Sequence, residues 1–250
     1  MSRLLSAPCG GQRIIPPSTA IAAVRKVTPP QRFVTRFAAE PPQEALPYGR
    51  WADTLGEHFA RACRELDAEG ADLGEAGGVA WFPDRSWGGR TYVPAVARTT
   101  TGYELFGFVS FAEGAGGAPS DFDARADFTS ETAESNPDWK LDLNDDVIGT
   151  WRGEHGNVAD MTLVWGVPMI AGGTVVTAEL ADLAVDQCPV VEERFTLIAP
   201  DNYRSDFLEI KLWDGRGREL AVESLYVDDE DEADEESEDD APGEDAAASS

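Results

Sequence analysis

The spacing of apolar residues changes near residue 70, and this change constrains the fold more than any other feature of the sequence. Residues 49–69 carry apolar side chains three or four positions apart, at Trp51, Leu55, Phe59, Ala62, Cys63 and Leu66. That spacing lines one face of an α-helix, and Gly70 follows as a residue that ends helices. Beyond a glycine-rich stretch, apolar and polar residues alternate, which is typical of β-strands. The sequence therefore predicts one amphipathic helix over 49–69 within a β-rich domain spanning 47–227.

The β-rich part consists of short runs rich in Val, Tyr, Phe and Trp, separated by turn-forming stretches such as PDRSWGG and TTTG. The run over 103–111 is apolar on both faces, so we expect it to be a central strand. Asp214 and Gly215 predict a hairpin turn. Its two strands would face each other through Leu208, Ile210 and Leu212 on one side and Leu220, Val222 and Tyr226 on the other. About eight to ten strands with one helix predict a mainly β fold, α+β by element count, arranged as an antiparallel β-sandwich or barrel.

Residues 112–138 are small, polar and acidic, and contain only two aromatic side chains. Such a composition offers little apolar surface to offset the entropy lost on ordering. We therefore expect a mobile loop between two parts of the sheet structure.

Charge is distributed unevenly along the chain, whose net charge is -27. Residues 1–39 hold six basic and no acidic residues, whereas residues 228–250 hold thirteen acidic and no basic ones. We expect residues 1–46 to form a flexible, proline-rich basic arm and residues 228–250 a disordered acidic tail. The segment between them is itself strongly acidic and would repel a phosphate backbone. This pattern excludes duplex nucleic acid and favours a basic protein partner, or self-association through the charged ends.

The cysteines and the N-terminus bear on the compartment. Cys9, Cys63 and Cys188 form no C-x-x-C pair, and an odd count favours free thiols in a reducing environment. No apolar run approaches the length needed to cross a bilayer, so no membrane is expected. The sequence favours the cytoplasm of a bacterium, with an organelle matrix as the alternative if residues 1–39 are a transit peptide.

One short acidic segment has the spacing of a calcium ligand set. Asp142, Asn144 and Asp146 follow a D-x-N-x-D pattern, in which alternate oxygens can converge on Ca²⁺ within a loop. The remainder of an EF-hand loop is missing, because Val147 and Gly153 stand where glycine and glutamate belong. No cofactor is expected, and calcium is the ion considered for this segment against an acidic turn between strands.

A second candidate site is the group Glu154, His155 and Asp160, which could bind a metal in a hydrolase. The alternative is an exposed loop histidine between glycines. The sequence has no G-x-S-x-G segment, no Walker loop and no dinucleotide-binding fingerprint. An enzyme is therefore the less favoured hypothesis.

Aromatic and basic residues cluster in the segment WFPDRSWGGRTY. Trp87 and Tyr92, with Arg85 and Arg90, could stack on a sugar ring or contact a proline-rich peptide. The alternative is that these aromatic side chains belong to the core and to a hairpin.

Three functions follow in order of preference. The first is a non-enzymatic protein-interaction or assembly module, whose acidic body binds a basic partner or self-associates through its charged ends. The second is a β-sandwich that binds a carbohydrate or another small ligand through exposed aromatics. The third is a metal-dependent hydrolase.

Overall fold

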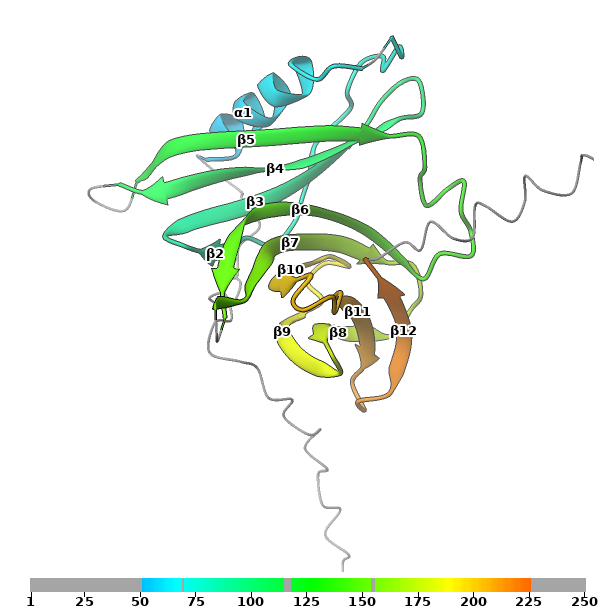
Figure 1. Cartoon of the computed structure of the whole chain (residues 1–250). Helices are drawn as coiled ribbons and strands as arrows, with labels where there is room; N and C mark the ends of the chain where they lie inside the picture. The colour runs from blue at the N-terminus through cyan, green and yellow to red at the C-terminus, as the bar shows by residue number, and fades with distance from the viewer. Residues whose placement is uncertain (1–50, 69, 115–117, 154–155, 226–250) are drawn as a thin grey trace, which may run out of the picture.

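One helix and twelve antiparallel strands, arranged in three sheets, make up the part of the chain that the structure describes (Figure 1). The structure is a computed structural model, and it describes residues 51–68, 70–114, 118–153 and 156–225. The predicted basic arm over 1–46 and acidic tail over 228–250 lie outside the described residues. The mainly β fold class is confirmed, but the described strands do not close into a barrel.

The first sheet contains five strands, with β4 at its centre. Its strand order is β1-β3-β4-β5, and β2 pairs with β3. The bounds are β1 Ala80–Trp81, β2 Arg85–Trp87, β3 Arg90–Arg98, β4 Glu104–Glu113 and β5 Pro119–Thr129. The central position predicted for residues 103–111 is confirmed, because β4 pairs with β3 on one side and β5 on the other.

The second and third sheets contain three and four strands. The second has the order β10-β7-β6, and the third has the order β12-β11-β8-β9. The second sheet consists of β6 Leu141–Arg152, β7 Val158–Pro168 and β10 Phe195–Asp201. The third consists of β8 Gly173–Leu180, β9 Leu183–Pro189, β11 Glu209–Asp214 and β12 Glu219–Ser224.

The helix α1 (Ala52–Arg64) covers one face of the first sheet. Leu55 and Phe59 are buried against Val93, Ala95 and other apolar residues of β3 and β4. The helix is shorter than the predicted 49–69. The backbone N–H of Glu65 bonds the carbonyl oxygens of both Arg61 and Ala62, which tightens and ends the last turn.

The opposite face of the first sheet packs on the second sheet. Tyr92 and Phe108 from the first sheet contact a core that includes Met161, Leu163 and Trp165 of β7. The other face of the second sheet packs on the third sheet through Val164, Leu197, Val176, Ile210 and neighbouring buried residues. Because successive strand residues point to opposite faces, the first and second sheets are each buried on both sides.

The mobile loop predicted over 112–138 is wrong for much of that range. Residues 112–113 belong to β4, and residues 119–129 form β5. The apolar face of β5 is Phe122, Ala124, Ala126 and Phe128, which pack with the helix and its core. Two of these four residues are alanines, so the alternation carries little hydrophobicity although its period is that of a strand.

The predicted hairpin at Asp214 is confirmed, because β11 pairs with β12 around this turn. The predicted inward position of Val222 is wrong: this residue pairs with Lys211 and is 43% exposed, while Ala221 is buried. A register shift between Leu212 and Trp213 reverses the expected alternation on the returning strand. Tyr226 lies outside the described residues.

Candidate functional site

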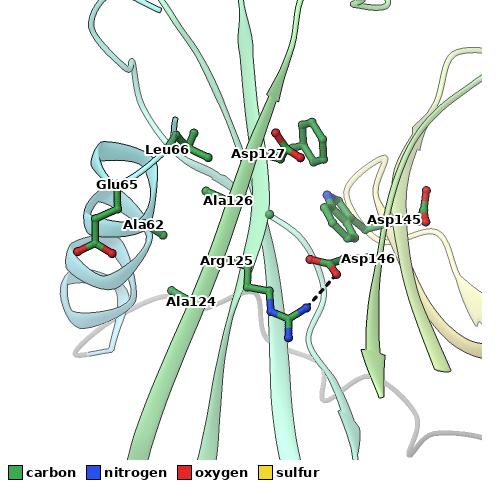
Figure 2. Close-up of a pocket in the computed structure, with 12 residues that line it drawn as sticks. Ala62, Glu65, Leu66, Ala124, Arg125, Ala126, Asp127, Asp145 and Asp146 are labelled. Atoms are coloured by element: carbon green, nitrogen blue, oxygen red, sulfur yellow. Dashed lines mark hydrogen bonds and ion pairs between the residues drawn. The ribbon is translucent and has the colours of Figure 1, made fainter. Parts of the chain in front are cut away.

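An open groove lies between β5 and β6, the strands that border the first and second sheets (Figure 2). It comprises two hollows of about 480 and 330 Å³, which share Phe106, Asp127 and Asp145 as lining residues. We call it the acidic groove. Its charged and aromatic lining residues are Glu65, Glu104, Phe106, Arg125, Asp127, Glu131, Trp139, Asp142, Asp145, Asp146 and Trp165.

The alternation of β5 supplies one wall of the acidic groove. Ala124 and Ala126 pack toward the helix side, so Arg125 and Asp127 project from the opposite face. Figure 2 shows Arg125 directed from β5 toward Asp146. The strand therefore separates an apolar face for the helix from a charged face for the groove.

The other wall comes from β6. Asp142, Asn144 and Asp146 occupy alternate positions and share one face of this strand. Asn144 pairs with Trp165 and Asp146 with Leu163, and both partners belong to the core between the first and second sheets. The polar face of β6 is thus directed toward the first sheet.

Negative charge in the acidic groove greatly exceeds positive charge. Seven acidic residues line it, although Figure 2 shows the carboxylates of Glu65 and Asp145 directed away from Arg125. Arg125 is the single cation among its described lining residues. The Arg125 Nη1 atom donates to Asp146 Oδ1 at 3.2 Å and to the carbonyl oxygen of Val147 at 3.1 Å. The positive charge of Arg125 therefore lies at one end of the groove, beside Asp146.

Glu104 is the most deeply placed of the carboxylates that line the groove, with a side chain 6% exposed. Arg98 Nε lies 2.9 Å from its Oε2. Burial, and secondarily the negative charge of Asp142, raise the pKa of Glu104, while Arg98 opposes this shift. Burial also raises the pKa of Asp142. Because burial disfavours the ionised form of both carboxyl groups, a cation bound beside them would stabilise that form.

Trp165 supplies an unpaired donor at the groove. Its side chain is fully buried, yet its indole Nε1 has no hydrogen-bond partner among the described residues. Trp165 lines the larger hollow beside Phe106, with ring centroids 6.5 Å apart. A buried N–H without an acceptor destabilises the fold. A ligand oxygen that accepted a hydrogen bond from this N–H would remove that penalty.

The predicted calcium set lies in this groove but not in a calcium loop. Asp142, Asn144 and Asp146 lie along β6, where alternate residues are about 7 Å apart and their oxygens cannot converge as they do in a loop. Within the described part of the chain, no three His, Cys, Asp or Glu side chains are placed to hold a metal ion. The expected acidic turn is also wrong, because the segment is a strand.

The predicted hydrolase group is only partly described. Glu154 and His155 lie outside the described residues, and Asp160 lies on β7, paired with Thr150 and Asp201 of the adjacent strands. The hydrolase therefore stays a hypothesis drawn from the sequence.

The predicted aromatic and basic cluster does come together, on the β2–β3 hairpin, but it faces the core. Arg85 pairs with Tyr92, and Trp87 with Arg90, in the strand register. Arg85 and Tyr92 are buried, Arg85 in an ion pair with Asp186 and Tyr92 against an aromatic neighbour. This placement differs from that of an exposed ligand-contacting cluster.

Trp87 and Arg90 also have partners within the protein. The Trp87 ring packs so closely on Gly149 of β6 that a Cβ there would lie 2.6 Å from the ring. Arg90 donates to Ser110 and to Asp121, with Nη1 2.6 Å from Asp121 Oδ2. The half-buried Trp87 therefore packs between the first and second sheets.

Comparison with protein-family models, curated proteins and solved structures finds no match to this chain. Among the described residues, no helix has the length and apolar character needed to span a bilayer.

Sequence reasoning did not identify the acidic groove. The available signal was the alternation in DFDARADF, where Asp123, Arg125 and Asp127 interleave with Phe and Ala. That pattern predicts a strand with one charged face. It does not predict that the charged face lies opposite Asp146, because this contact joins separate sheets.

Proposed function

We propose that this protein is a non-enzymatic interaction module whose acidic groove binds a basic, extended segment of a partner protein. The observation that carries the proposal is the combination of an excess of lining acidic residues over a single lining cation with an unpaired indole N–H. A cationic side chain would pair with the carboxylates, and a peptide carbonyl oxygen would accept from Trp165. A simple cation offers no such acceptor, so a peptide meets both requirements better.

The strands beside the groove support an extended ligand. Among the described strands, β5 pairs only with β4, and β6 pairs only with β7, so each is an edge strand. Edge strands carry backbone groups that a peptide can bond by adding a further strand. Backbone bonds would give affinity, and alternate side chains would enter the acidic lining.

Aromatic side chains within the groove favour cations further. Phe106 lines both hollows, and Trp139 lines the smaller one. A guanidinium or ammonium group within about 6 Å of such a ring gains a cation–π attraction. Arginine suits this environment especially well, because its planar guanidinium group can stack on an aromatic ring and donate to a carboxylate at the same time.

Equilibrium binding of a fluorescein-labelled peptide of alternating arginine and serine, followed by anisotropy, tests the proposal. The D127N/E131Q double variant removes two exposed carboxylates that line the groove, without a change in side-chain shape. We expect it to weaken binding by about tenfold, at roughly 0.7 kcal/mol for each partly exposed charge pair.

The matched control is E193Q/E219Q, which makes the same change in net charge at exposed positions that do not line the groove. We expect it to bind as the wild type does at physiological salt, because distant exposed charges are largely screened there. Equal weakening by both double variants would indicate nonspecific attraction and would contradict the proposal.

A further inference from the structure

We propose that residues 25–36 of this chain are a ligand of the acidic groove in the same molecule, so that the protein regulates its own binding site. The proposal rests on the proposed function, because it requires that the groove accept a basic peptide. It adds an internal competitor, which any external partner must displace.

Charge complementarity is the first argument. The segment RKVTPPQRFVTR contains Arg25, Lys26, Arg32 and Arg36 and no acidic residue, whereas acidic residues outnumber the single arginine in the lining of the groove. The segment also offers carbonyl oxygens, one of which could accept from the unpaired Nε1 of Trp165.

The composition of the segment agrees with an extended ligand. Pro29 and Pro30 exclude a continuous helix through its middle and fix extended backbone angles. Val27, Phe33 and Val34 favour strand geometry and can contact aromatic rings. An extended chain is the form that two bordering edge strands can bond.

The length of chain before the described residues permits the contact. The helix begins at Ala52, and Ala62, Glu65 and Leu66 at its far end line the groove. The helix is about 20 Å long. Residues 37–50 connect the proposed ligand to the helix start, and this connection spans up to about 45 Å when extended. The tether is thus long enough to follow the helix and enter the groove.

A tether of this length makes the internal ligand effective even when its intrinsic affinity is low. Short linkers give effective concentrations in the millimolar range. A segment with an intrinsic dissociation constant of about 0.25 mM would therefore raise the apparent dissociation constant of an external peptide about fivefold at an effective concentration of roughly 1 mM.

The test uses the full-length chain with Arg3, Arg13, Arg25, Lys26, Arg32 and Arg36 all replaced by glutamine, and the arginine–serine peptide as the probe. We expect this neutralised chain to bind the probe about fivefold more tightly than the wild type. In the matched control the five arginines become lysines and Lys26 becomes arginine, which keeps the charge. We expect the control to bind within about twofold of the wild type, since the ion pairs persist.

The outcomes separate this inference from the proposed function. If the neutralised chain binds the probe no more tightly than the wild type, while D127N/E131Q still weakens binding, internal occupancy is wrong and the proposed function stands. If neither the wild type nor the neutralised chain binds the probe, both are wrong. If sedimentation shows a wild-type dimer that the neutralised chain does not form, the segment binds a second copy, and occupancy within one molecule is overturned.

Discussion

Arg85 of β2 and Asp186 of β9 form a buried ion pair that joins the first sheet to the third. Their side chains are 1% and 3% exposed, and Arg85 Nη2 donates to Asp186 Oδ2. Asp186 Oδ2 also accepts from the backbone N–H of Ile198 at 2.9 Å, which ties in β10 of the second sheet. Arg85 Nε and Nη1 have no partner among the described residues, so Asp186 is the main compensation for this buried charge.

We expect Asp186→Asn to lower the free energy of unfolding by about 3–5 kcal/mol, because it leaves the Arg85 charge buried without a counter-charge. Urea denaturation measures the change. Asp121→Asn is the matched control, since it removes the exposed partner of Arg90 and should cost less than about 1 kcal/mol. Similar losses of unfolding free energy in the two variants would show that the buried ion pair contributes no more to stability than the exposed pair does.

Trp87→Ala should reduce stability rather than only ligand binding. The ring packs on Gly149 and belongs to the core between the first and second sheets. Because Trp87 is only partly buried, we expect a loss of about 2 kcal/mol, below the range for a fully buried aromatic. Leu183→Ala, at a residue 65% exposed, should change the unfolding free energy little. A stable Trp87→Ala chain that loses glycan binding would instead restore the carbohydrate hypothesis.

Asp84 should make stability depend on pH. Burial raises its pKa to about 6 from a usual value of 3.8, and its Oδ1 has no partner among the described residues. Between these values the folded protein holds more protons than the unfolded chain, so the contribution of Asp84 stabilises the fold as pH falls from 7 toward 4. We expect Asp84→Asn to raise the unfolding free energy by up to about 2 kcal/mol at pH 7. The gain should shrink toward zero at pH 4; an equal gain at both pH values would exclude this cause.

Gly107 of β4 should tolerate no side chain. Its φ is +153°, and a Cβ would lie 2.2 Å from the carbonyl oxygen of Arg125 on β5. We expect Gly107→Ala to cost about 2 kcal/mol or more, because the two strands must move apart. Gly56→Ala in the helix is the control of opposite sign, since nothing lies within 4 Å of its Cβ and alanine favours helix by about 1 kcal/mol. Thermal unfolding of both variants checks the pair.

The parts of the fold predicted from sequence are those with strong local periodicity. The helix was found from the spacing of Leu55 and Phe59, and the hairpin from Asp214 and Gly215, because both signals lie within one element. β5 was missed because alanines occupy half of its apolar face, so low hydrophobicity outweighed a period of two. The position of Val222 was missed because a register shift cannot be read from alternation alone.

The candidate site was less predictable than the fold. Asp142, Asn144 and Asp146 were singled out for calcium, but they lie along a strand and form one wall of the acidic groove. The sequence predicts ligand contacts at Arg85 and Trp87, although both side chains face the core. In both cases the residue types were informative, whereas their surroundings depended on how separate sheets pack. Such contacts between sheets have no local signal.

The most direct test of peptide binding in the acidic groove is the indole N–H resonance of Trp165, observed by ¹⁵N–¹H NMR. The neutralised chain is titrated with the arginine–serine peptide, and Trp165→Phe assigns the signal. We expect the Trp165 signal to move downfield as its Nε1 gains an acceptor. The Trp213 signal should stay in place, since its Nε1 already donates to Thr177 at 2.9 Å. Saturable binding that leaves the Trp165 signal unmoved would contradict the proposed site.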